Sequence, residues 1–169
     1  MRLPAILLAC AAALLAGCAG YHLGPVNGGA ARDKSIEVLP FNNQTLQPRL
    51  GDAVTQALRE RFQADVTYHL NTHGDADIVL TGVITRYHRQ GLSYLNKDAT
   101  TTQNYRVDIV AHVIARERAT GKTLLDKNVT AYTLVNVGAD LASSERQASP
   151  QLAEDLARNI AELLTDGAW

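Results

Sequence analysis

The sequence is poor in cysteine, and both of its cysteines lie near its start. The chain has 169 residues, and its two thiols belong to Cys10 and Cys18. Disulfide bonds and cysteine-ligated metals are therefore excluded beyond residue 18. Long hydrophobic runs are missing as well. The apolar stretch from Leu3 to Leu15 would form a helix of about 20 Å, which is too short for a comfortable span of a hydrocarbon core about 30 Å thick.

A strong excess of charge of either sign is also absent. The formal net charge is −1 at pH 7, and without a basic excess we do not expect binding to nucleic acid. The charge is nevertheless uneven along the chain, because residues 82–137 have four more basic than acidic residues and residues 138–169 have four more acidic than basic ones. This asymmetry suggests a face that meets an anionic partner, although a solvated face of mixed charge is the commoner explanation.

Catalytic and metal-binding motifs are missing too. The sequence has no glycine-rich phosphate loop, no Gly-x-Ser-x-Gly elbow and no Ser-x-x-Lys pair. His69 and His73 are four residues apart, but they flank a predicted strand end and turn, so they do not share the helical face that a zinc pair requires. Asp75 and Asp77 fit the turn before a strand better than a cation site. We therefore expect no enzyme, no metal and no cofactor.

The first residues resemble the signal of a bacterial lipoprotein. Arg2 and the apolar run are followed by Leu15-Ala16-Gly17-Cys18, which is similar to the lipobox. The resemblance implies that Cys18 is alkylated by a diacylglyceryl group, becomes the first residue after cleavage and is acylated on its amine. Two or three acyl chains make such an attachment stable. An ordinary signal peptide that happens to end in cysteine is the alternative.

Three segments follow from this division of the chain. Residues 1–17 are predicted to be the signal peptide, and residues 18–34, which are rich in glycine, to be the acylated N-terminus and a tether. Residues 35–169 are predicted to form a single domain, which is long enough to bury a core of its own. Residue 19, directly after the predicted lipid attachment, is alanine and not aspartate. By resemblance to the sorting rules of bacterial lipoproteins, this favours the outer membrane.

Alternating apolar residues predict four to five strands in this domain. The clearest period starts at Tyr105, where every second residue as far as Ala115 is apolar or aromatic. Residues 90–103 are polar and rich in turn-forming residues, so they are predicted to be a connection. The predicted strands are 35–41, 66–70, 76–89, 105–116 and 123–137.

Helical spacing of apolar residues predicts two helices. The first covers Pro48 to Ala64, with proline in its first turn. The second begins with Ser149 as the N-cap and Pro150 at the first helical position, or else starts earlier, from Asp140, with Pro150 as a kink. Two helices on one face of a mainly antiparallel, four- to five-stranded sheet make an α+β two-layer sandwich.

Tyrosine and arginine gather near the two longest predicted strands. These residue types anchor protein interfaces, and their cations can meet phosphates. An ordinary sheet surface explains the pattern equally well. The residues are Tyr87, Tyr94 and Tyr105 with Arg86, Arg89, Lys97 and Arg106.

Several segments together resemble the LPS-assembly lipoprotein (LptE) family across nearly the whole chain after Cys18. The most specific is Gly20-Tyr21-His22-Leu23, directly after the predicted lipid attachment. The others are Leu39-Pro40-Phe41-Asn42-Asn43, the helix that contains Leu50, the segment Ala76-Asp77-Ile78-Val79-Leu80-Thr81-Gly82, and Thr120-Gly121 before the last strand.

This resemblance implies a non-catalytic lipoprotein, anchored by its lipid in the outer membrane and facing the periplasm or lying within a barrel lumen. In the family, the domain plugs the LptD β-barrel, assists its assembly and helps to deliver lipopolysaccharide to the outer leaflet. No lipid-binding motif is transferred with the resemblance. Lys97, Arg106 and Arg146 are our candidate lipopolysaccharide contacts, because they are charged and lie near predicted loops or strand ends.

Two alternatives remain at this point. The segments Leu39 to Asn43 and Ala76 to Gly82 are also similar to LpoB and CsgG-type lipoproteins, which activate peptidoglycan synthases or build secretion pores. Those proteins have longer or differently built tethers, and Gly20 to Leu23 does not suit them well. A periplasmic hydrolase is supported only by isolated histidine and aspartate residues.

Overall fold

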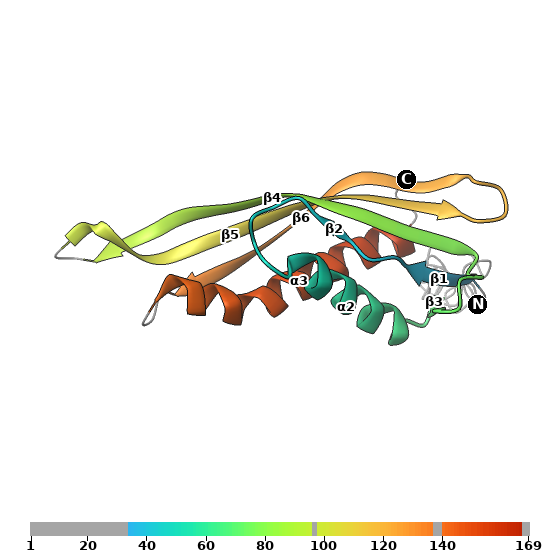
Figure 1. Cartoon of the computed structure of the whole chain (residues 1–169), viewed down its shortest axis with the longest axis horizontal. Coiled ribbons are helices and arrows are strands. Elements are labelled where there is room, and N and C mark those ends of the chain that lie inside the picture. Colours follow the sequence, from blue (N-terminus) through green and yellow to red (C-terminus); the bar gives the residue numbers. More distant parts are fainter. Residues whose placement is uncertain (1–33, 96–97, 137–139, 167–169) are drawn as a thin grey trace, which may run out of the picture.

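The computed structural model describes residues 34–95, 98–136 and 140–166. Within these residues, six strands form one sheet, and the two helices lie together on one of its faces (Figure 1). In chain order the elements are β1 (Lys34–Val38), β2 (Asn42–Asn43), α2 (Leu50–Gln63), β3 (Tyr68–Leu70), β4 (Ile78–Leu95), β5 (Asp98–Glu117), β6 (Thr123–Asn136) and α3 (Leu141–Asp166).

The sheet is mixed in direction. Its strand order is β3-β1-β4-β5-β6, and β2 pairs separately with β4. The three long strands β4, β5 and β6 are antiparallel to their neighbours, whereas β1 pairs in parallel with β3 and β4, and β2 pairs in parallel with β4. The predicted α+β two-layer arrangement is confirmed, and the short N-terminal strands add a parallel part to it.

The core lies between the sheet and the two helices. Along β5, the side chains of Val107, Ile109, Ala111, Val113 and Ala115 alternate inward, and each is at most 1 % exposed. Period-two burial of this kind is what a strand with one covered face shows. The helices contribute the facing layer, chiefly Val54, Leu58 and Phe62 from α2 and Leu152, Leu156 and Ile160 from α3.

The connection predicted at residues 90–103 is wrong. β4 runs on to Leu95 and β5 starts at Asp98, so the two strands form one long hairpin that reaches beyond α2 (Figure 1). Pairing continues past the predicted boundary, with Gly91 opposite Tyr105. Consecutive residues of this outer part are polar in the sequence, as from Thr100 to Asn104, and such a strand gives no hydrophobic period from which it could be predicted.

The second helix begins earlier than Ser149. α3 starts at Leu141 and contains Pro150 in its interior, so the reading of Ser149 as an N-cap is wrong and the alternative with Pro150 inside a longer helix is confirmed. Asp140 caps the helix, because its Oδ1 accepts the backbone N–H of Ser143 at 2.7 Å. The same hydrogen bond is the main reason that the pKa of Asp140 lies below its usual value.

Phe41 joins three elements at the centre of the sheet. Its backbone N–H donates to Thr55 Oγ1 on α2 at 2.9 Å, and its carbonyl oxygen lies 2.6 Å from where a Cβ on Gly51 would be. Its ring fills the space above Gly82 on β4, where a Cβ would overlap the ring atoms. Glycine at positions 51 and 82 therefore lets the β1–β2 connection, the first turn of α2 and β4 approach one another closely.

We expect Gly82→Ala to destabilise the protein by about 1–3 kcal/mol, because the added methyl group overpacks a buried site. Urea unfolding of the two proteins measures the difference. Phe41→Leu should relieve the clash, so the double variant should lose less stability than the sum of the two single variants. Strictly additive losses would show that the ring and the Gly82 backbone do not compete for this space.

Candidate functional site

Arg106 lies on the face of the sheet opposite α2 and α3, which we call the helix-free face because neither of these described helices covers it. Its neighbour Val107 points into the core, and in a strand the next residue points the opposite way. Arg106 Nε donates to Asp108 Oδ1 at 2.8 Å, and the guanidinium carbon is 4.0 Å from the centroid of the Tyr132 ring. The charge of Arg106 is thus already shared with a carboxylate and an aromatic ring.

The rest of this helix-free face is partly apolar. Tyr132 and Leu134 on β6 are 55 % and 61 % exposed. Val110 and Ile114 on β5 are half-buried although neither α2 nor α3 covers them. His112 Nε2 lies 2.8 Å from Asp126 Oδ1 on the same face. The face therefore mixes aliphatic, aromatic and paired charged groups, which is the composition of many protein interfaces.

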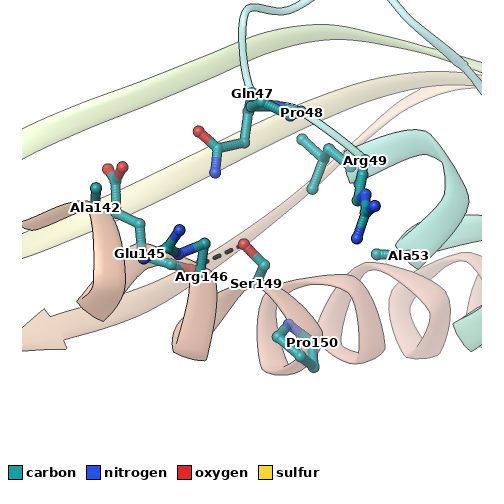
Figure 2. A pocket seen from close by; sticks show the side chains of 10 residues that line it. Gln47, Pro48, Arg49, Ala53, Ala142, Glu145, Arg146, Ser149 and Pro150 are labelled. Atoms are coloured by element: carbon teal, nitrogen blue, oxygen red, sulfur yellow. Dashed lines mark hydrogen bonds between the residues drawn. The ribbon is translucent and has the colours of Figure 1, made fainter.

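Arg146 lies on the helical side of the molecule, on α3. Its guanidinium donates to Ser143 Oγ at 2.9 Å, and it lines a cavity between α3 and the start of α2 (Figure 2). The sheet separates Arg146 from Arg106, so the structure does not bring these two predicted contacts together. Lys97 and Cys18 lie outside the described residues.

The cavity has a volume of about 650 Å³, which is within the usual range for small-molecule sites. Residues before and within the first turn of α2 form one wall, and the first half of α3 forms the other, as Figure 2 shows. Its lining combines apolar groups with two arginines and one carboxylate. The residues are Gln47, Pro48, Arg49, Leu50 and Ala53 on one side, and Ala142, Glu145, Arg146, Ser149 and Pro150 on the other.

Glu145 is buried at the edge of this cavity, with 6 % of its surface exposed. Its Oε1 forms an ion pair with Arg89 Nε on β4 at 2.7 Å. The angles of this contact do not meet the criteria for a hydrogen bond to Oε1. Burial, followed by the charge of Glu145 and a hydrogen bond to it, raises the pKa of Tyr87 to about 12. Glu145 thus fastens the first turns of α3 to the β4–β5 hairpin through Arg89 and Tyr87.

Arg49 is the residue directly before α2, and its backbone is left-handed, with φ 60° and ψ 8°. Within the described residues it is the only residue other than glycine with a positive φ. Such a conformation costs about 1–2 kcal/mol for a residue with a Cβ. Its side chain gives α2 no capping hydrogen bond, although serine, threonine, aspartate and asparagine ordinarily provide one at this position.

The sequence reading missed both Glu145 and Arg49. A signal for Glu145 was present, because Leu141, Glu145, Ala148 and Leu152 continue the apolar stripe of α3 with spacings of four, three and four. This stripe was not recognised, because the predicted helix began at Ser149. For Arg49, the signal was the absence of any capping residue directly before Leu50.

The isolated histidines and aspartates have structural partners or stay in solvent. Asp77 Oδ2 accepts the backbone N–H and the hydroxyl of Ser35, both at 2.8 Å, which joins β1 to β4 and lowers the pKa of Asp77. Asp75 Oδ1 accepts the side-chain amide of Asn71 at 2.7 Å. His69 and His73 are exposed.

Neither a metal cluster nor a membrane-spanning helix occurs in the described part of the chain. Within residues 34–95, 98–136 and 140–166, no three His, Cys, Asp or Glu residues gather where they could hold a metal ion. Among the helices of the same residues, none is both long and apolar enough to cross a membrane.

Solved structures share this fold at low sequence identity. Protein XCC0632 from Xanthomonas campestris matches with a TM-score of 0.62 and 8% identity, over 87% of this chain and 92% of that one. The hypothetical protein CT253 from Chlamydia trachomatis matches with a TM-score of 0.56 and 11% identity, over 79% of this chain and 97% of that one. At such identities the likeness concerns the fold alone.

A search of curated proteins gave no match. The model of the LptE family, described as lipopolysaccharide-assembly, matches residues 34–165. This match extends from the first residue of β1 almost to the end of α3, so it includes the whole sheet and both helices. The chain therefore belongs to the LptE family of lipopolysaccharide-assembly proteins.

Proposed function

We propose that this protein is a non-catalytic lipoprotein of the outer membrane, anchored through Cys18. In this proposal the α+β domain plugs an LptD-type β-barrel, assists the assembly of that barrel and helps to deliver lipopolysaccharide to the outer leaflet. The observation that carries the proposal is the family match over residues 34–165. The lipobox-like sequence that ends at Cys18 supports the anchor.

The surface of the domain supports a role in binding a protein partner. The helix-free face of the sheet carries exposed Tyr132 and Leu134 beside the stacked guanidinium of Arg106. Tyrosine and arginine are enriched where proteins contact one another, and exposed aliphatic groups between them favour burial. We propose this face as the surface that meets the barrel.

Lipopolysaccharide contact is proposed at two separate places. Arg106 would meet the glycolipid on the helix-free face, and Arg146 would meet it on the helical side. Lys97, which the sequence places between β4 and β5, is the third proposed contact. Because the sheet lies between Arg106 and Arg146, each arginine should contribute to binding independently of the other.

Affinity purification of the acylated full-length chain from outer membranes in mild detergent tests the partner. We expect a large outer-membrane β-barrel to be recovered with it, and Tyr132→Glu with Leu134→Glu should reduce that recovery because two charges would be buried at the contact. Asp166→Lys, an exposed change at the far end of α3, is the control. Recovery of a peptidoglycan synthase in place of a barrel would refute the proposal.

Charge reversal tests the glycolipid contacts. Arg106→Glu, Arg146→Glu and Lys97→Glu should each weaken lipopolysaccharide binding at low salt, and the differences from the unchanged protein should shrink at about 0.5 M salt because exposed charges are screened. Titration of the purified protein with lipopolysaccharide at both salt concentrations measures this. Arg61→Glu, at the exposed end of α2, serves as the control. If one of the three charge-reversal variants binds lipopolysaccharide as the unchanged protein does, its position is not a contact.

Mass spectrometry of the protein isolated from cells tests the anchor. Cys18→Ala should abolish acylation, because the thiol that receives the diacylglyceryl group is gone, and the variant should leave the membrane fraction. A Cys10→Ala variant should keep its lipid and its location. A Cys18→Ala protein that still carries lipid would disprove the attachment at this residue.

A further inference from the structure

We propose that the outer half of β6, residues 130–136, is an association surface for a second copy of this chain, through antiparallel pairing of the two strand edges. β6 is the last strand in the order of the sheet, so one of its sides has no neighbouring strand. We call this side the free edge. The inference goes beyond the proposed function, because it concerns backbone groups of the domain and needs neither a barrel nor a lipid.

Two threonine hydroxyls show which way the backbone of β5 points. Thr81 Oγ1 and Thr85 Oγ1 on β4 donate to the carbonyls of Ile114 and Val110, both at 3.3 Å. The backbone groups of these two β5 residues therefore face β4. Thr130 is the β6 partner of Val110. In an antiparallel pair the two opposed residues either face each other or both face away, so Thr130 faces away from β5.

A contact with α3 gives the same direction independently. Asn159 Nδ2 on α3 donates to the Thr130 carbonyl at 2.8 Å, which places that carbonyl on the free edge. The direction of the backbone groups alternates along a strand, so the N–H and C=O of Tyr132 and Leu134 also point to the free edge. Among the described residues, no hydrogen bond reaches the backbone of Tyr132 or Leu134 from that side. Such unpaired groups are a template for a further strand.

The other open edges of the described sheet are protected against pairing. β3, at the opposite end of the order, has only three residues. β4 is open on one side beyond Ile84, where its pairing with β2 ends, but this part carries Arg86, His88 and Arg89. Short edge strands and charges are the usual means by which proteins prevent edge pairing. Residues 128–136 of β6 contain no charge, no proline and no glycine, so this edge lacks that protection.

An identical strand is the partner that this edge fits. A strand that pairs with β6 needs an unprotected edge of its own, and folded proteins ordinarily protect theirs. Within the described residues the free edge of β6 is such an edge, and a two-fold axis would place its N–H groups opposite the C=O groups of the second copy. Because residues 128–136 are uncharged, no like charges would meet across the axis.

The side chains at this edge are suited to the same pairing. With the two-fold axis at Thr133, Tyr132 of each copy lies opposite Leu134 of the other. Both side chains are exposed in the single copy, and an aromatic ring opposite an aliphatic side chain is a favourable cross-strand pair. The contact uses a short length of one strand, so it is smaller than a standard stable interface and the dimer should be weak.

Analytical ultracentrifugation of the acylated full-length protein tests the dimer, with detergent micelles in excess over protein. We expect a dimer fraction that rises with protein concentration between about 1 and 200 µM, by mass action. Leu134→Pro should remain monomeric, because proline removes an N–H that only the second copy would accept. An unchanged protein that is monomeric throughout would overturn the proposal.

Leu134→Ala is the matched control for the proline variant. It removes the same side chain but keeps the backbone N–H, so it should still form the dimer, with a dissociation constant raised less than about tenfold. Complete loss of the dimer in both variants would show that the copies meet through side chains alone, and the edge pairing would be wrong.

A proline one residue earlier tests the assigned direction of the backbone. The N–H of Thr133 faces β5, where its partner is Val107. Thr133→Pro should therefore lower the midpoint of urea unfolding clearly, whereas Leu134→Pro should change it little. The opposite result would place the N–H of Leu134 inside the sheet and overturn the free edge as assigned.

Leu134→Lys provides a test that does not depend on proline. It places a cation close to the same cation of the second copy, so it should weaken the dimer about tenfold or more at low salt and less at about 0.5 M salt. A Leu134→Lys protein that forms the dimer as well as the unchanged protein does would exclude this edge as the contact.

Discussion

The close approach of Phe41 to Gly82 is the constraint on which the rest of the fold depends. The ring occupies the space that a side chain at position 82 would need, and the backbone of Phe41 is bonded to Thr55 on α2. The contact fixes the short parallel strands, the first helix and the long hairpin relative to one another. The position of Arg49, directly before α2, is therefore set by packing in the core, and its strained backbone is held by the surrounding structure.

Much of the fold could be predicted because one face of the sheet is covered. The alternation from Tyr105 to Ala115 and the apolar stripes of both helices reflect burial directly. The outer hairpin could not be predicted, because its strands pair through the backbone while consecutive residues of its sequence are polar. The start of α3 was misplaced because proline usually opens a helix, whereas here the helix begins at Leu141 and the contact of Glu145 with Arg89 stabilises the turns before Pro150.

The candidate site was predictable only in part, for a related reason. Arg146 was chosen by charge and does line the cavity, but Arg106 lies across the sheet from it and is paired with Asp108. A single sequence does not reveal how far apart two such residues lie in space. Arg49 and Glu145 were identified only from the structure. There Arg49 has a left-handed backbone, Glu145 is buried, and both line the same cavity. The two segments of the LptE resemblance that contain Phe41 and Gly82 meet in the structure, so that resemblance has a physical basis in packing.

The domain is thus a two-layer sandwich with apolar and paired charged groups on its helix-free face and a charged cavity on its helical side, and we propose that it binds other molecules through these surfaces. Depletion of the protein from living cells, followed by measurement of lipopolysaccharide at the cell surface and of barrel abundance, tests this role most directly. We predict that surface lipopolysaccharide and the correctly assembled barrel both decrease. Normal surface lipopolysaccharide together with altered peptidoglycan cross-linking would contradict it.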